Sequence, residues 1–156
     1  MSRKGPRSVL IIEARFYEDI SDELARGAIA ELNAQHIDFE RLSVPGALEI
    51  PVALSLALAN GFVGRAGRHR GCIALGCVIR GETTHYEIVA RESAAGLHQL
   101  AVAHAVPIGN GIITCDSREQ ALARASVTGR NKGRDAARAY LSLMQLEQHF
   151  SSASRR

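Results

Sequence analysis

Short apolar runs alternate with helical patterns along this chain, and this alternation constrains the fold more than any other feature of the sequence. Residues 9–12 and 72–79 are continuous apolar runs, as expected for strands that are covered on both faces. Weaker strand patterns lie at 38–44 and 106–114. Between the strands, apolar residues recur every three or four positions, which predicts helices. Strands and helices in this order predict a parallel sheet with helices on both faces.

Each expected helix has its own pattern or end signal. The sequence SREQ at 117–120 matches a capping box, and the short helix that it opens is expected to end at Ala125. Another four helices are expected. The first carries Ile20, Leu24, Ala28, Ile29 and Leu32 on one stripe, and the second opens at Pro51 and closes at Asn60. The third runs from about His85 to Ala105, and the fourth runs from Asp135 to Phe150. Right-handed crossovers then predict an α/β fold of three αβα layers, with a flavodoxin-like parallel sheet of four strands in the order 2-1-3-4.

The composition fits a single domain over residues 1–156, with 1–7 and 151–156 expected to be flexible ends. No apolar run approaches the roughly 18 residues of a membrane span, and the run at 9–12 is too short for the core of a signal peptide. We therefore expect a cytoplasmic protein with no membrane partner. Aromatic residues make up only 4% of the chain and are not interleaved on a basic helix face, so we expect no nucleic-acid partner.

The cysteines and histidines predict neither a disulfide nor a metal site. Cys72, Cys77 and Cys115 are an odd number of thiols and fit buried, unreactive cysteines. His98 and His104 lie six residues apart on one expected helix, so they face different sides. The sequence also has no dinucleotide fingerprint and no Walker motif. We therefore expect a reaction that needs no cofactor and no metal.

The unusual residues of the chain follow the expected strands. In a doubly wound sheet, ligands bind beyond the carboxyl ends of the strands, where the strand order reverses. The reversal here falls between the first and third strands, so Phe16 and Arg80 are expected to emerge side by side. Residues 46–49 and the end of the fourth strand border the same edge. This convergence predicts a binding site at the carboxyl edge of the sheet.

The segment 76–86 concentrates polar chemistry at one end of a buried strand. Its apolar part ends at Arg80, and Glu82, Thr83 and His85 follow at the expected start of a helix. Free backbone N–H groups and the helix dipole favour an anion there. Histidine is the side chain that most readily transfers protons near neutral pH. The segment therefore predicts a phosphorylated small molecule beside a proton carrier, the alternative being an ordinary helix cap with a surface histidine.

Four more side chains near this edge each have two interpretations. Phe16 is either a stacking platform for a planar ring or an aromatic residue at the margin of the core. Glu49 either hydrogen-bonds a polyol or is a helix-terminal charge without another task. Arg124 and Lys132 flank the break between the last two expected helices, and each is either a site residue or a surface charge.

Six motifs, taken together and in order, resemble those of the lumazine synthases of riboflavin biosynthesis over about residues 8–148. They are ARF at 14–16, VPGALEIP at 44–51, GCVIRGETTH at 76–85, GNGIIT at 109–114, EQALARA at 119–125 and NKG at 131–133. Each motif alone is weak, whereas all six at suitable spacing are highly specific.

The resemblance implies a cofactor-free transferase. In that reaction 5-amino-6-(D-ribitylamino)uracil condenses with 3,4-dihydroxy-2-butanone 4-phosphate to 6,7-dimethyl-8-ribityllumazine, and phosphate and water are released. The alternative is a weakly catalytic paralogue that binds flavin or lumazine. That alternative rests on Leu48 and Asn110, which stand where aromatic residues are common in the family.

The resemblance also implies a role for each site residue. His85 transfers protons, Glu82 and Thr83 bind phosphate through their main chain, and Arg124 binds phosphate with Lys132 and Asp135 in support. The pyrimidine and its ribityl chain are implied to contact Phe16, Ala47, Leu48, Glu49, Cys77, Val78, Ile79 and Asn110.

Finally, the resemblance implies a homo-oligomer with active sites at its subunit interfaces, where Arg124 and the end of the fourth strand come from the adjacent subunit. Members of the family are pentamers, and some assemble into sixty-subunit shells. Shell-forming members typically have a glycine directly before the asparagine of the last interhelical turn, and this chain has Arg130 before Asn131. We therefore expect a free pentamer that acts on small-molecule substrates.

Overall fold

Strands and helices alternate along the chain as the sequence predicts. The computed structural model describes residues 8–155. Its strands are β1 (Ser8–Ala14), β2 (Asp38–Val44), β3 (Cys72–Ile79) and β4 (Ile108–Cys115). Its helices are α1 (Glu18–Ala34), α2 (Glu49–Ala59), α3 (His85–His104), α4 (Arg118–Ala125) and α5 (Lys132–Ala153).

The four strands form one parallel sheet with the order β2-β1-β3-β4, so the predicted order is confirmed. In this sheet β1 pairs with β2 on one side and with β3 on the other, and Glu13 lies opposite both Ser43 and Leu75. The strands β2 and β4 form the two edges. The reversal of strand order therefore lies between β1 and β3, as expected.

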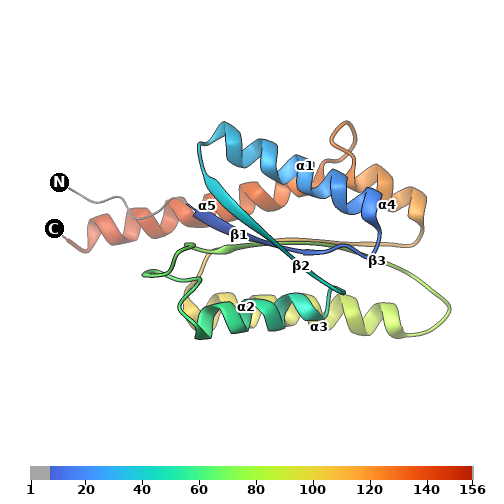
Figure 1. Cartoon of the computed structure of the whole chain (residues 1–156), viewed down its shortest axis with the longest axis horizontal. Coiled ribbons are helices and arrows are strands. Elements are labelled where there is room, and N and C mark those ends of the chain that lie inside the picture. The colour runs from blue at the N-terminus through green and yellow to red at the C-terminus, as the bar shows by residue number, and fades with distance from the viewer. Residues whose placement is uncertain (1–7, 156) are drawn as a thin grey trace.

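Helices cover both faces of the sheet, which confirms the three-layer αβα fold. The helices α1, α4 and α5 lie on one face, and α2 and α3 lie on the other (Figure 1). Successive residues of β1 point to opposite faces, so Ile11 packs with Leu24 and Tyr140, whereas Ile12 packs with Leu54 in a second core. Each face of β1 is thus covered by a different layer of helices.

Two element boundaries differ from the sequence expectation near the site. The helix α2 begins at Glu49 and not at Pro51. Proline is accommodated in the first turn because the first N–H groups of a helix have no intrahelical partner. The strand β4 runs from Ile108 to Cys115, later than the expected range 106–114. Both shifts leave the predicted site residues at the carboxyl edge.

The last helix is longer than expected at both ends. It begins at Lys132 because the side chain of Asn131 accepts a hydrogen bond from the Arg134 N–H at 3.4 Å, with Asn131 in a left-handed conformation. It ends at Ala153 and not at Phe150, so the first part of the segment expected to be flexible is helical. The other expected flexible end, residues 1–7, lies outside the described residues.

The short helix α4 begins as the capping box predicts. The Ser117 hydroxyl accepts a hydrogen bond from the Gln120 N–H at 3.2 Å. The Gln120 side chain accepts from the Asp116 N–H at 2.8 Å, one residue earlier than in the usual reciprocal arrangement. Over residues 8–155, none of the helices is long and apolar enough to cross a membrane.

Candidate active site

The first structural part of the site is the loop after β1. Phe16 is the second residue after the strand, and its side chain is 74% exposed. Its ring meets Tyr17 edge-on, with the ring centroids 4.9 Å apart. Phe16 is therefore exposed at the carboxyl edge, where its ring is accessible to a planar ligand.

A small apolar cluster joins the next three segments of the predicted site. Ala47, Val78 and Val89 are buried together, and Tyr86 and Ile112 pack against them. These residues come from the β2–α2 connection, β3, α3 and β4. The fold thus brings the predicted residues Ala47 and Val78 together beside the first turn of α3.

The side chains of the 76–79 segment point to both faces of the sheet. Val78 belongs to the apolar cluster above, whereas Cys77 and Ile79 pack against the core under α1, α4 and α5. Only the main chain of Cys77 and Ile79 can therefore contact a ligand on the α2–α3 face. Burial raises the pKa of the Cys77 thiol to about 12, which keeps it protonated and supports the expectation of an unreactive cysteine.

Residues 46–49 form a tight entry into α2. The Glu49 N–H donates to the Gly46 carbonyl at 3.1 Å. A Cβ at Gly46 would lie 3.0 Å from a Glu49 carboxylate oxygen, so this side chain folds back over the turn. Leu48 occupies the N-cap position and is exposed. Glu49 and Leu48 therefore both lie at the carboxyl edge, as predicted.

The loop that leads into α3 presents backbone donors that are unpaired within residues 8–155. Thr84 is its N-cap residue without a side-chain cap, and the His85 N–H donates to the Thr83 hydroxyl at 3.3 Å. Among residues 8–155, the amides of Glu82 and Thr83 have no acceptor. The side chains of Glu82, Thr83 and His85 are all exposed. This segment therefore has the donors and the dipole that an anion needs.

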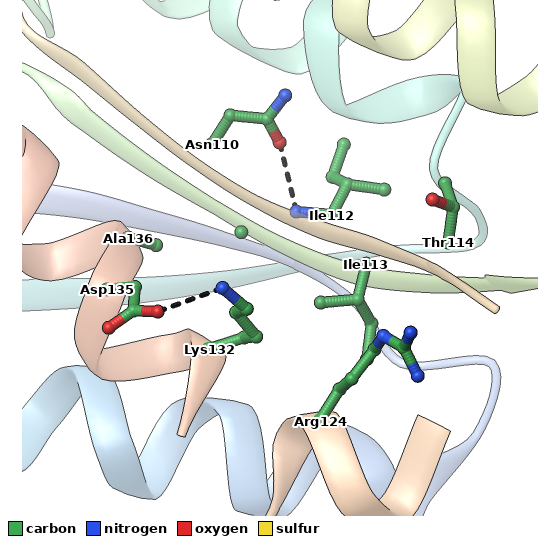
Figure 2. A pocket seen from close by; sticks show the side chains of 9 residues that line it. Asn110, Ile112, Ile113, Thr114, Arg124, Lys132, Asp135 and Ala136 are labelled. Carbon is green, nitrogen blue, oxygen red and sulfur yellow. Dashed lines mark hydrogen bonds and ion pairs between the residues drawn. The ribbon is translucent and has the colours of Figure 1, made fainter. Parts of the chain in front are cut away.

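A pocket of about 330 Å³ lies along the free edge of β4, and we call it the edge pocket (Figure 2). Its floor is the strand itself, and the helices α4 and α5 supply one wall. The Asn110 side chain accepts a hydrogen bond from the Ile112 N–H at 2.9 Å. The residues that line the edge pocket are Asn110, Gly111, Ile112, Ile113, Thr114, Arg124, Lys132, Asp135 and Ala136.

The edge pocket brings together the predicted cations. The Lys132 ammonium lies 3.1 Å from the Asp135 carboxylate, so these two charges offset each other. Arg124 is half-buried and makes no ion pair within the described residues. The pocket therefore retains one uncompensated positive charge, which suits a phosphate group.

The predicted residues are distributed over both faces of the sheet. His85 begins α3 on one face of the sheet, whereas Arg124 belongs to α4 on the other face (Figure 1). The residues therefore form two groups. One group comprises Phe16, Ala47, Leu48, Glu49, Cys77, Val78, Ile79, Glu82, Thr83 and His85, and the other comprises Asn110, Arg124, Lys132 and Asp135.

Most of the chain matches proteins that share one name. A family model described as 6,7-dimethyl-8-ribityllumazine synthase matches residues 6–148. The chain belongs to this family. A relative named 6,7-dimethyl-8-ribityllumazine synthase 1, from Rhodopseudomonas palustris, is 51% identical over 146 residues, which are 93% of this chain and 88% of the relative.

Two further relatives named 6,7-dimethyl-8-ribityllumazine synthase show the same extent of similarity. The Beijerinckia indica protein is 52% identical over 146 residues, covering 94% of this chain and 78% of the relative. The Nitrobacter hamburgensis protein is 48% identical over 145 residues, covering 92% of this chain and 88% of the relative. The predicted lumazine synthase family is thus confirmed, and these matches do not favour a weakly catalytic flavin-binding paralogue.

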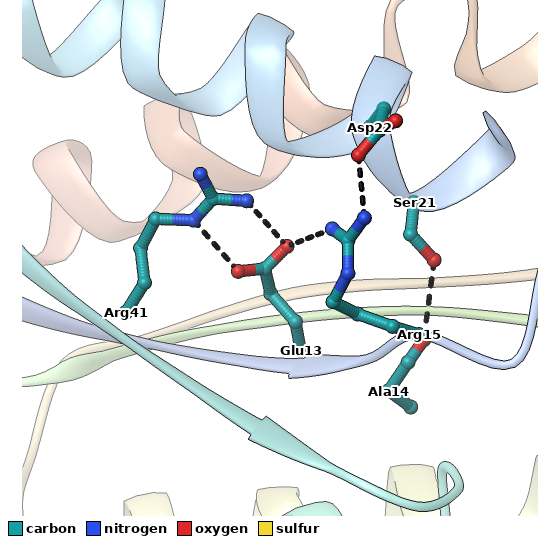
Figure 3. A network of polar contacts seen from close by, with 6 residues as sticks. All are labelled: Glu13, Ala14, Arg15, Ser21, Asp22 and Arg41. Atoms are coloured by element: carbon teal, nitrogen blue, oxygen red, sulfur yellow. Dashed lines mark hydrogen bonds and ion pairs between the residues drawn. The ribbon is translucent and has the colours of Figure 1, made fainter. Parts of the chain in front are cut away.

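The sequence analysis missed one buried group near this lumazine synthase site. Glu13 lies at the end of β1 with its carboxylate between Arg41 and Arg15 (Figure 3). The strand β1 continues beyond the apolar run 9–12 through Glu13 to Ala14, and the Glu13 side chain is only 2% exposed. A lone acidic residue inside an apolar strand, with Arg15 two residues later, is the signal that could have found it.

Proposed function

We propose that this chain catalyses the condensation of 5-amino-6-(D-ribitylamino)uracil with 3,4-dihydroxy-2-butanone 4-phosphate to 6,7-dimethyl-8-ribityllumazine, with release of phosphate and water. The observation that carries the proposal is the match to synthases of this name over more than nine-tenths of the chain. The reaction is a transferase step of riboflavin biosynthesis.

The proton carrier of the proposed reaction is His85. It stands at the N-terminus of α3, next to the Glu82 and Thr83 amides that have no acceptor among residues 8–155. A phosphate held by those amides would place the reacting carbons of the ketone beside the imidazole. From there His85 can remove and return protons while the imine forms and phosphate leaves.

The second phosphate contact in the proposal is Arg124. Its guanidinium lines the edge pocket and makes no ion pair within the described part of the chain. Lys132 and Asp135 support it from the start of α5 by keeping a charge pair at the pocket wall. A phosphate dianion would meet two kinds of donor, the fork of an arginine and the amides of a helix N-terminus.

The pyrimidine side of the proposal uses the remaining residues. Phe16 stacks on the ring through its exposed face, and the apolar floor is formed by Ala47 and Val78. The main chain of Cys77 and Ile79 and the side chain of Glu49 contact the polar atoms of the ring and the ribityl chain. Leu48 and Asn110 complete the walls.

Catalysis in this proposal is mainly positioning. Two substrates and a proton carrier are held in reacting geometry, which can lower a barrier by about 7–11 kcal/mol. We expect no metal or cofactor to take part, and this expectation stays a prediction. Within residues 8–155, no group of three or more His, Cys, Asp or Glu side chains could hold a metal ion.

We further propose that the active site is completed between subunits of a homopentamer. The separation of His85 and Arg124 on opposite faces supports this, because a second chain against the free edge of β4 could unite the two groups. Arg130 before Asn131 favours the free pentamer over a sixty-subunit shell. A cytoplasmic location also stays a prediction.

The direct experiment mixes the purified protein with both substrates and follows formation of the fluorescent product. We expect a rate well above that of the same mixture without protein. A rate equal to the uncatalysed background would overturn the proposed function.

A further inference from the structure

We infer that Glu13 is a positioning residue for the pyrimidine side of the site, and that it acts through Arg15 to hold Phe16. The inference rests on the stacking role proposed above for Phe16. Glu13 is the penultimate residue of β1, and its carboxylate is 2% exposed. A buried carboxylate is costly unless it is paired, so its partners decide what it does in the fold.

The first partner of Glu13 is Arg41 on the neighbouring strand β2. The Arg41 Nε donates to one carboxylate oxygen at 2.8 Å, and an Nη atom donates to the other at 3.0 Å. This two-pronged contact raises the pKa of Arg41, chiefly through the hydrogen bonds to Glu13. Arg41 therefore holds the orientation of the Glu13 carboxylate.

The second partner is Arg15, which bridges the strand and the following helix. One Nη atom donates to Glu13 at 3.1 Å, and the other donates to Asp22 of α1 at 2.5 Å (Figure 3). The pKa of Arg15 is raised, chiefly by the hydrogen bond to Asp22. The guanidinium thus ties the end of β1 to the second turn of α1.

Phe16 lies in the chain between Glu13 and Asp22, the two residues that Arg15 bridges. It is the residue after Arg15, and the aromatic ring that it meets is that of the neighbouring Tyr17. The Ser21 hydroxyl donates to the Ala14 carbonyl at 3.4 Å, and the Ser21 N–H donates to the Tyr17 carbonyl at 2.9 Å. The main chain on either side of Phe16 is held by polar contacts, and burial contributes little because the ring is exposed.

The expected effect of Glu13 is selective for one substrate. The side-chain partners of Arg15 among residues 8–155 are Glu13 and Asp22, so none of the proposed phosphate contacts at Glu82, Thr83 and Arg124 is held by this bridge. Loosening Arg15 should therefore disturb the stacking of the pyrimidine and leave the phosphate contacts intact. A general loss of stability would weaken the use of both substrates together.

The test compares steady-state kinetics of Glu13→Gln with those of the unchanged chain at a temperature where both are folded. We expect the KM for the ribitylaminouracil to rise about threefold to tenfold, the size of a weakened aromatic stacking contact, with the KM for the phosphorylated ketone unchanged. Glu31→Gln is the matched control, because it also removes a carboxylate that pairs with an arginine, Arg138 at 3.2 Å. Glu31 lies near the end of α1, away from Phe16. The KM values of Glu31→Gln should stay the same.

Phe16→Ala separates the inference from the function on which it rests. If the unchanged chain has no activity, the proposed reaction fails. If Phe16→Ala leaves the KM for the pyrimidine unchanged, the stacking role fails and the inference with it. If Phe16→Ala raises that KM, Glu13→Gln should add nothing in the Phe16→Ala background, because both changes act on one contact.

Two results overturn the positioning role itself. One is an unchanged pyrimidine KM in Glu13→Gln when Phe16→Ala raises it. The other is an equal rise in the KM of both substrates. If Glu13→Gln does not fold, Asp22→Asn replaces it, since Asp22 is exposed and holds the other end of the Arg15 bridge. The same selective rise in KM is then expected, and its absence counts against the inference.

Discussion

His85 and Arg124 stand on helices that cover opposite faces of the same four-stranded sheet. His85 opens α3, and Arg124 lies in the last turn of α4. Both follow a strand at the carboxyl edge, so each is placed for binding, but the sheet lies between their helical layers. The proposed reaction uses both side chains at one phosphate, and the proposed pentamer would supply them from two copies of the chain.

Replacing His85 with alanine should slow turnover and leave substrate affinity nearly unchanged. We expect kcat to fall about 100-fold, at the lower end of what general acid–base groups contribute, because positioning supplies most of the rate. Stopped-flow or steady-state fluorescence measures the rate after subtraction of the uncatalysed reaction. His98→Ala, an exposed histidine on the same helix, is the control and should retain full kcat.

Replacing Arg124 with alanine should act mainly on the phosphorylated substrate. Loss of a charge-assisted contact worth about 1.5–3 kcal/mol predicts an increase in the KM for the ketone phosphate of about 10- to 100-fold. Inhibition by inorganic phosphate should weaken in parallel. Arg138→Ala, which removes a surface charge paired with Glu31, should behave like the unchanged chain. An Arg124→Ala protein with both kinetic constants intact would show that Arg124 has no phosphate role.

Replacing Gly133 with alanine should destabilise the fold and the edge pocket together. A Cβ at Gly133 would collide with the Leu24 carbonyl oxygen of α1. The first turn of α5, which carries Lys132 and Asp135, must then move away, at a cost of about 1–3 kcal/mol. Urea unfolding measures the loss. Gly81→Ala is the stability control, since its Cβ meets no atom within 4 Å, and equal stabilities of the two variants would refute the packing argument.

Stability should fall at alkaline pH because of Cys72. Burial raises the pKa of this thiol from 9.0 to about 12. Between these values the unfolded chain loses the proton and the folded chain keeps it, so the free energy of unfolding decreases by up to about 1.4 kcal/mol per pH unit. Urea unfolding from pH 8 to pH 11 should show a shallower decline for Cys72→Ala. Parallel declines for the two proteins would contradict the assigned cause.

The sheet and its strand order were predictable because each strand carries its own pattern. The run at 72–79 is apolar on both faces, and right-handed crossovers leave few topologies for four parallel strands. Helix ends were less predictable where a residue type that breaks helices, such as asparagine or glycine, can also cap a helix or pack closely inside one. Asn131 and Gly133 suggested a break, yet Asn131 caps α5 and Gly133 lies inside its first turn against α1.

The site was predictable where its residues follow strands, and less so where it depends on side-chain partners. Phe16, residues 46–49 and His85 could be placed at one edge from topology alone. The buried Glu13 could not, because its partner Arg41 comes from a weakly patterned strand, and only the register of β1 with β2 brings the two together. The grouping of Arg124 with Lys132 likewise depends on how α4 and α5 pack beside β4.

The proposed synthase has an active site that combines His85 of one subunit with Arg124 of another. The most direct test co-expresses His85→Ala and Arg124→Ala chains with different affinity tags and purifies the mixed oligomers through both tags. Random mixing restores about a quarter of the sites, since such sites take their histidine from one variant and their arginine from the other. We predict activity well above that of either variant alone. Mixed oligomers no more active than the average of the two variants would contradict the shared site.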